Sequence, residues 1–332
     1  SYLDRYSREK NIFHGVIEVD LDDSTLFTLG HTLQKSDANS PMWGALPLNF
    51  SDGSATDYSR STSTSSDWAY WDVQENRTFA ELAHNFANGW QAKAVLTHVE
   101  KKGDGSLFYM YGTPDRDTGL GLFSYPSEYQ DKNKQLVADL YASGPFALAG
   151  REHELVVGGS WSKSELEDTS WYDSTTGTAL PPLEDWNGNI GKPLNDMPTN
   201  GSDFTDRMQS VYSAARFSLT DSLNLIAGAR VVDVDSDGTN YGESKSTSYN
   251  NEVVPYAGLV YDLNEQYSVY ASYTEIFDPQ TKQDASGNRL APVEGVNYEA
   301  GIKAELLDDK VNLSLAVFRA EQDNVAAVAG MS

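Results

Sequence analysis

The chain has 332 residues, a mean hydropathy of -0.50 and a formal net charge of -25. Such a charge opposes binding to duplex nucleic acid, because the phosphates would repel it. There is no run of about 18 apolar residues, which excludes a transmembrane helix. There is also no cysteine, which excludes disulfides, thiolate metal sites and cysteine nucleophiles.

The repeating signal along the chain is an alternation of apolar and polar residues with a period of two. A pleated strand sends successive side chains to opposite faces, so this pattern predicts strands with one apolar and one polar face. Each predicted strand has about 10 residues, the length needed to cross a bilayer at a tilt. In chain order the predicted strands are 13–21, 26–34, 78–86, 90–97, 135–143, 155–161, 211–219, 223–231, 253–263, 267–274, 296–306 and 311–317.

The last strong strand shows what the alternation predicts for a membrane. One set of residues should point to lipid and the other into a lumen. The lipid set is Val296, Tyr298, Ala300, Ile302 and Ala304, and the lumen set is Asn297, Glu299 and Lys303.

The connections fall into two classes. Short ones occupy 88–89, 220–222, 264–265 and 307–310, and long polar ones occupy 36–72, 101–132, 164–206, 236–251 and 278–295. Transmembrane β-barrels have this asymmetry, with tight turns on one side and long loops on the other. Aromatic residues near strand ends (Trp90, Trp161, Tyr261, Tyr267 and Tyr273) fit interfacial girdles. The prediction is an all-β fold, an antiparallel up-and-down barrel; the alternative is a soluble β-sandwich or propeller.

Motifs for metal or catalysis are weak. The run from Asp233 to Gly238 imitates the start of an EF-hand loop, but the twelfth position is Ser244 where a bidentate Glu is needed. We therefore interpret it as the acidic end of a strand entering a Gly-rich loop. The histidines are dispersed, and no nucleophile elbow or phosphate-binding loop occurs. We predict no metal site and no catalytic residue.

Segments near the end of the chain resemble the TonB-dependent siderophore receptors, in particular those for ferric pyoverdine, ferrioxamine and ferric coprogen. The resemblance lies in 267–280, Gly287, 290–295, 297–303, 313–319 and 322–325, and in the upstream segment Trp43-Gly44-Ala45-Leu46-Pro47-Leu48. It implies a 22-stranded outer-membrane barrel with an N-terminal plug domain and a TonB box. Residues 1–332 would be the central part of that barrel, with the plug and the C-terminal strands outside this chain.

The resemblance also implies a function. A receptor in the outer membrane of a Gram-negative bacterium would capture a ferric siderophore and import it with energy from TonB, catalysing no reaction. Iron would stay on the siderophore, so no cofactor is expected. The expected partners are the siderophore, TonB, and outer-membrane lipid with lipopolysaccharide. The alternatives are another TonB-dependent ligand (a cobalamin, a haem or an oligosaccharide) and a passive porin or adhesin.

Large aromatic residues gather in the predicted outer loops: Trp43, Trp68, Trp71, Trp171 and Trp186, with Tyr109 and Tyr111. They could pack on one another to order the loops, or they could contact a flat, partly aromatic ligand. We predict that Trp43, Trp71, Tyr109 and Tyr111 line an outer pocket for the ferric siderophore. Trp43 and Trp71 would share one long loop, and Tyr109 and Tyr111 one face of the next.

Overall fold

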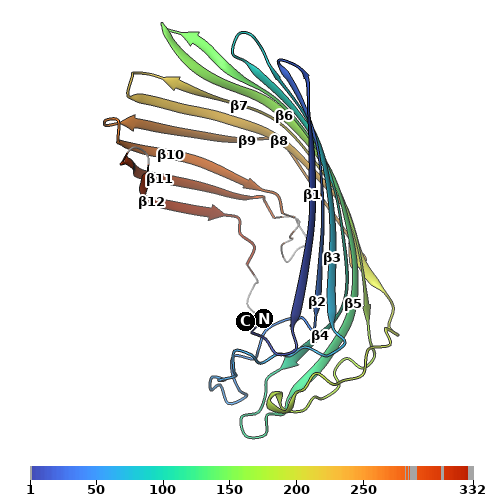
Figure 1. Cartoon of the computed structure of the whole chain (residues 1–332). Helices are drawn as coiled ribbons and strands as arrows, with labels where there is room; N and C mark the ends of the chain where they lie inside the picture. Colours follow the sequence, from blue (N-terminus) through green and yellow to red (C-terminus); the bar gives the residue numbers. More distant parts are fainter. Residues whose placement is uncertain (1, 281, 283, 285–289, 308–309, 328–332) are drawn as a thin grey trace.

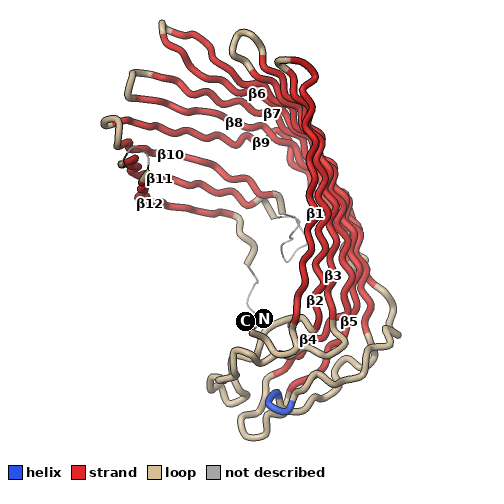
Figure 2. Tube along the Cα trace, in the orientation of Figure 1, coloured by secondary structure: helices blue, strands red, loops and turns tan. Residues whose placement is uncertain are grey.

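The computed structural model describes residues 2–280, 282, 284, 290–307 and 310–327, so Gly287 and two residues of the predicted short connection, 308–309, lie outside the described residues. The described chain folds into one curved antiparallel sheet (Figures 1 and 2). The strands are β1 (Ser7–Asp22), β2 (Thr25–Asn39), β3 (Tyr70–Asn85), β4 (Gln91–Gly112), β5 (Leu122–Leu148), β6 (Arg151–Tyr172), β7 (Asn200–Ser218), β8 (Leu223–Asn240), β9 (Glu243–Asp262), β10 (Tyr267–Asp278), β11 (Val293–Leu306) and β12 (Val311–Asp323).

The sheet is a continuous meander in which every strand pairs with its neighbour in sequence, in the order β1 to β12. The predicted up-and-down topology and the twelve predicted strands are confirmed. The one helical element among the described residues is a 3-10 turn at Leu183–Asp185. Within the described part of the chain, no helix has both the length and the apolar character needed to span a membrane.

The strands are longer than predicted, ranging from 12 residues in β10 to 27 in β5. The predicted loop 101–132 is wrong for most of its length, because β4 and β5 continue through it and leave only 113–121 between them. The predicted loop 236–251 is likewise a hairpin of β8 and β9 that turns at Tyr241 and Gly242. A strand that extends beyond a bilayer needs no apolar face. The parts of β4, β5, β8 and β9 that lie within the predicted loops therefore lack the alternation of apolar and polar residues that predicts the other strands.

The long loops lie at one end of the sheet, as predicted, but the two-residue turn at Tyr241 and Gly242 lies at that end too, whereas the sequence predicts a strict division (Figure 1). The loops 40–69, 113–121 and 173–199 gather at the lower end in that view, called here the loop end. The run from Asp233 to Gly238 lies entirely within β8, so it forms an extended strand and neither a calcium loop nor the predicted Gly-rich loop.

The two faces of the sheet differ in chemistry. On the face called here the inner face, Lys93 Nζ lies 2.6 Å from a Glu81 carboxylate oxygen, and the Tyr212 hydroxyl donates to Asp139 over 3.2 Å. The other face, called the outward face, exposes Leu96 by 49% and Leu140 by 62%. The polar set therefore faces a lumen, and the apolar set is the surface that a bilayer would cover.

Strand β11 shows the predicted alternation. Tyr298 and Ile302 are exposed on the outward face. The neighbouring residues Glu299 and Lys303 turn to the inner face, where Glu299 accepts a hydrogen bond from the Tyr270 hydroxyl and the Lys303 ammonium lies 5.2 Å from the Tyr270 ring centroid. The predicted division of this strand between two faces is confirmed.

Candidate ligand-binding site at the loop end

The candidate site is built on the hairpin of β4 and β5, which pairs in unbroken register from Gln91↔Ser143 to Gly112↔Leu122. Because the register has no shift, alternate residues keep the same face along the whole hairpin. Tyr109 and Tyr111 of β4 therefore share the inner face with Lys93. Tyr125 lies directly opposite Tyr109 on that face.

Trp43 reaches this face from the loop 40–69 and packs among three tyrosines. Its ring centroid lies 5.9 Å from that of Tyr109, 6.4 Å from that of Tyr125 and 5.3 Å from that of Tyr129, each in an edge-on arrangement. Tyr111 extends the group, with its ring 6.4 Å from that of Tyr125. Edge-on aromatic pairs are favourable and leave ring faces available for a further partner. These five residues are called the aromatic cluster.

A glycine lets the loop backbone come this close. Gly44 has a φ of +86°, and a Cβ added there would lie 2.2 Å from the Tyr109 ring. Any other residue would meet both a strained backbone and a collision with Tyr109.

Trp71 lies beside the cluster, although not in the loop where it was predicted. It is the second residue of β3, directly opposite Gly105 of β4, and so lies on the inner face. Gly105 in turn lies opposite Tyr129. Trp71 is 44% exposed and Tyr111 is 38% exposed, so both rings present area that a ligand could cover.

The opposite, outward face of the same hairpin is covered by loops. Phe108 is fully buried and stacks on Trp186, with ring centroids 5.4 Å apart and planes 7° apart. Trp68 meets Phe108 edge-on at 5.9 Å. For Trp68 and Trp186 the loop-packing interpretation is therefore correct. Trp171, expected in a loop, lies in β6.

Hydrogen bonds tie the loops 40–69 and 173–199 into one unit. The indole N–H of Trp186 donates to the Ser65 carbonyl over 2.8 Å, and that of Trp68 donates to the Ile190 carbonyl over 2.9 Å. The Arg5 guanidinium adds donors to the carbonyls of Ser63 and Ser65. The loop 40–69, which carries Trp43, is thus held in place by residues that are far from it in the sequence.

A buried carboxylate closes the loop 173–199. Asp173 is the first residue of the loop and is fully buried. Its carboxylate accepts hydrogen bonds from the backbone N–H and the hydroxyl of Thr175, two residues further on. It also accepts from the backbone N–H groups of Leu194 and Asn195, near the other end of the loop. Burial by itself would raise the pKa of Asp173, but these hydrogen bonds outweigh it and hold the pKa below its ordinary value. Asp196 completes the closure by accepting from the Ser174 N–H and hydroxyl.

The structure thus brings Trp43, Tyr109 and Tyr111 together and places Trp71 on the same face. Sequence reasoning missed Tyr125 and Tyr129. They fell in a segment interpreted as a loop, and their spacing of four residues does not by itself distinguish a strand from a helix. Among the described residues, no three histidine or acidic side chains gather in a way that could hold a metal ion.

Comparison with known proteins identifies the fold. The family model described as TonB dependent receptor-like, beta-barrel matches residues 18–331. The chain belongs to the TonB-dependent receptor β-barrel family. This family consists of receptors and transporters, and its barrels lie in the outer membrane of Gram-negative bacteria.

Two similar proteins are named as receptors for a ferric siderophore. The ferripyoverdine receptor of Pseudomonas aeruginosa is 40% identical over 98% of this chain and 40% of its own length, and a ferric-pyoverdine receptor of Pseudomonas putida is 38% identical over 98% and 42%. A crystal structure of the former, bound to ferripyoverdine, matches with a TM-score of 0.91 over 98% of this chain and 43% of that one. The chain thus spans about two fifths of the length of these relatives.

Proposed function

We propose that this chain is part of an outer-membrane receptor that captures a ferric siderophore of the pyoverdine class and imports it with energy supplied through TonB. The observation that carries the proposal is the aromatic cluster with Trp71, which lies on the inner face at the loop end. Two relatives that are 38% and 40% identical are named as receptors for ferric pyoverdine, which favours that class.

The proposal also covers the rest of the receptor, its source of energy and the absence of catalysis. The twelve strands work within a larger barrel that also has a plug and a TonB box. Iron is cargo and stays coordinated by the siderophore, so the receptor uses no cofactor and performs no catalysis. Half-buried rings suit this task, because they can stack on a flat chelate while polar groups of the loops meet its fringe.

The other candidate classes lack such support. A passive porin has no need for an aromatic cluster on the inner face of β4 and β5 beneath a loop that is tied to its neighbour by hydrogen bonds. A cobalamin, haem or oligosaccharide receptor would share the barrel but not the ligand named for the relatives. Growth of a receptor-deletion strain on a panel of iron-loaded siderophores, with and without the intact receptor gene, separates these classes.

The direct test is a titration of the intact receptor with ferric pyoverdine. Trp43→Ala should weaken binding by about 1–3 kcal/mol, the loss typical of an aromatic anchor, without lowering the amount of folded receptor. The matched control is Trp161→Ala, which removes an indole from the outward face. An unchanged dissociation constant in Trp43→Ala would remove Trp43 from the site. If Trp43 only holds the loop, protease sensitivity of 40–69 should rise while affinity stays the same.

A further inference from the structure

Asparagine is followed directly by glycine at three places in the chain. The pairs are Asn88-Gly89, Asn187-Gly188 and Asn200-Gly201. At such a pair the backbone nitrogen of the glycine can attack the side-chain amide carbon of the asparagine and expel ammonia. Glycine favours this ring closure because it has no Cβ in the way and because its backbone turns freely. The three pairs differ in what the attacking nitrogen and its backbone are bonded to.

The pair Asn187-Gly188 lies where the two long loops of the loop end are tied together. The Gly188 carbonyl accepts a hydrogen bond from the Asp67 N–H over 3.0 Å. Trp186 and Ile190 make the adjoining contacts to the same loop as Asp67. Asn187 therefore lies between two of the contacts that join the loops, while its own side chain is exposed to water.

The side-chain amide of Asn187 is arranged for attack. Its Oδ1 atom accepts a hydrogen bond from the Asn189 N–H over 3.0 Å. Negative charge develops on this oxygen when the amide carbon is attacked, so a donor already directed at it stabilises the transition state. The attacking group, the Gly188 N–H, donates no hydrogen bond within the described part of the chain. No bond therefore has to break before the ring closes.

The pair Asn88-Gly89 has the same arrangement except for one bond. The Asn88 Oδ1 atom accepts from the Trp90 N–H over 3.2 Å. Gly89 has a φ of +82°, against +83° for Gly188. The Gly89 N–H, however, donates to the Phe86 carbonyl over 3.1 Å. Attack by Gly89 must first break this bond, and a hydrogen bond of ordinary strength slows the attack by about 2- to 10-fold.

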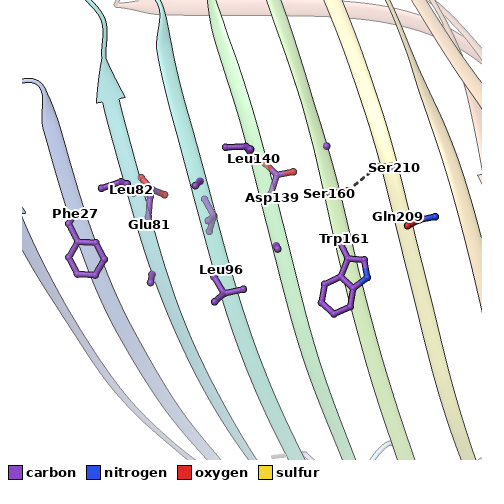
Figure 3. Close-up of a pocket in the computed structure, with 15 residues that line it drawn as sticks. Phe27, Glu81, Leu82, Leu96, Asp139, Leu140, Ser160, Trp161, Gln209 and Ser210 are labelled. Atoms are coloured by element: carbon purple, nitrogen blue, oxygen red, sulfur yellow. Dashed lines mark hydrogen bonds between the residues drawn. The ribbon is translucent and has the colours of Figure 1, made fainter.

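The pair Asn200-Gly201 is held in the barrel wall. Both residues belong to β7 and pair with β6. Further along the same two strands the Ser160 and Ser210 hydroxyls lie 2.8 Å apart, and Figure 3 shows the strands side by side at that bond. Ring closure requires the backbone to rotate between the asparagine and the glycine. Pairing in the sheet opposes that rotation, so this pair should react slowest.

We propose that Asn187 deamidates spontaneously and that the product loosens the tie between the two loops. The Gly188 nitrogen forms a bond to Asn187 Cγ and gives up its proton, while the Cγ–Nδ2 bond breaks and ammonia leaves with that proton. Water then opens the succinimide at either carbonyl and leaves an aspartyl or an isoaspartyl residue. In the isoaspartyl product the main chain runs through the side-chain methylene and is longer. The contacts of Trp186 and Gly188 then no longer fit the spacing of their partners.

The site is tested on the intact wild-type receptor, incubated at mildly alkaline pH and sampled over time. Peptide mapping by mass spectrometry follows the conversion of each amide to an acid, and enzymatic methylation detects isoaspartyl residues. Asn187 should convert about 2- to 10-fold faster than Asn88, and Asn200 more slowly than both. Conversion of Asn187 no faster than that of Asn88 would overturn the proposal. An aspartyl product without any isoaspartyl product would overturn the succinimide route.

The same receptor unfolded in guanidinium chloride is the control for the effect of the fold. All three pairs have glycine as the attacking residue, so they should convert at similar rates once their hydrogen bonds are gone. A difference between Asn187 and Asn88 that persists unchanged in the unfolded chain would show that neighbouring sequence sets the rates. That result would contradict the explanation from the Gly89 and Gly188 N–H groups.

Hydrogen exchange measures the loosening. Amides of both loops should lose protection in aged wild-type receptor but keep it in aged Asn187→Ser, whose hydroxyl can still accept from the Asn189 N–H and which has no amide to lose. Fresh Asn187→Asp adds the charge without lengthening the chain, so it should stay protected. Unchanged protection in the aged wild type would overturn the loosening, and equal loss in Asn187→Asp would assign it to charge. Fresh wild type is the reference if Asn187→Ser folds poorly.

Neither measurement involves a ligand, and the inference goes beyond the proposed function without depending on it. An unmodified Asn187 would leave the proposed function untouched. A fresh receptor that fails to bind ferric pyoverdine would contradict the proposed function and leave the rates of deamidation as they are.

Discussion

Replacing Asp173 by alanine should open the loop 173–199 without unfolding the barrel wall. The Asp173 carboxylate is fully buried and joins the two ends of the loop by accepting hydrogen bonds from the N–H groups of Leu194 and Asn195. A hydrogen bond to a charged acceptor contributes about 1.5–3 kcal/mol. Loss of the two crossing bonds should therefore cost about 3–6 kcal/mol locally, which raises the equilibrium constant for loop opening about 10²- to 10⁴-fold.

Hydrogen exchange of the refolded receptor measures this opening directly, because protection of loop amides reports local stability separately from that of the strands. Amides of 173–199 should lose protection in Asp173→Ala while those of β5 and β6 keep theirs. Asp196→Ala is the control. It removes another carboxylate from the same loop, but an exposed one, so its effect should be smaller. Equal protection in Asp173→Ala and wild type, or a loss spread through the strands, would refute this account of how the loop is closed.

The same carboxylate predicts a pH dependence. A carboxyl group whose pKa is lowered on folding stabilises the fold fully above its unfolded pKa, and this contribution is lost as pH falls through the folded value. The pKa of Asp173 is lowered from an ordinary value of 3.8. Loop protection should thus be constant at neutral and mildly acidic pH and should fall only below that ordinary value. A loss of protection centred near pH 6 would point to another group.

Three further substitutions test other parts of the structure. Ile302→Arg should destabilise the barrel by about 2–4 kcal/mol if the residue lies near the bilayer midplane, whereas Glu299→Gln should cost far less. Equal losses of stability in refolding assays would contradict the assignment of Ile302 to the lipid side and Glu299 to the lumen side of β11. Gly44→Ala should lower siderophore affinity through its collision with Tyr109, and unchanged affinity would show that the loop can move aside at no cost. Trp186→Phe keeps the stack on Phe108 but removes one of the two donors to the Ser65 carbonyl, the other being the Arg5 guanidinium, so loop amides should exchange faster by an amount equivalent to about 0.5–1.5 kcal/mol; wild-type exchange would mean that Arg5 or water replaces the indole.

The fold could be predicted from sequence wherever one face of a strand meets lipid, because only there does apolar character alternate strictly. Residues 107–110 of β4 show why the extensions were missed. Leu107 is buried on the inner face, and Phe108 and Met110 are buried under loops on the outward face. With apolar residues on both faces the period of two disappears, although the backbone remains a strand.

The candidate site could be predicted only in part. Tyr109 and Tyr111 had to share a face if they were extended, and they do. Nothing local distinguishes Trp43, which joins the tyrosines on the inner face, from Trp68 and Trp186, which form a core under the loops. That difference depends on contacts such as Trp186 with Ser65, 121 residues apart in the chain. Such pairings are set by how two loops meet, and a single sequence does not encode them in any short pattern.

The length of β4 sets how far from the bilayer a ligand is first met. Tyr109 lies about 13 residues beyond Leu96, and at about 3.3 Å per residue this is about 40 Å along the strand, or about 30 Å in height at a tilt near 40°. In the proposed receptor, first contact with the chelate would therefore occur well above the level of Leu96, within whatever layer covers the membrane surface. The arrival rate should then respond to the thickness and viscosity of that layer, and should be nearly indifferent to the fluidity of the hydrocarbon below.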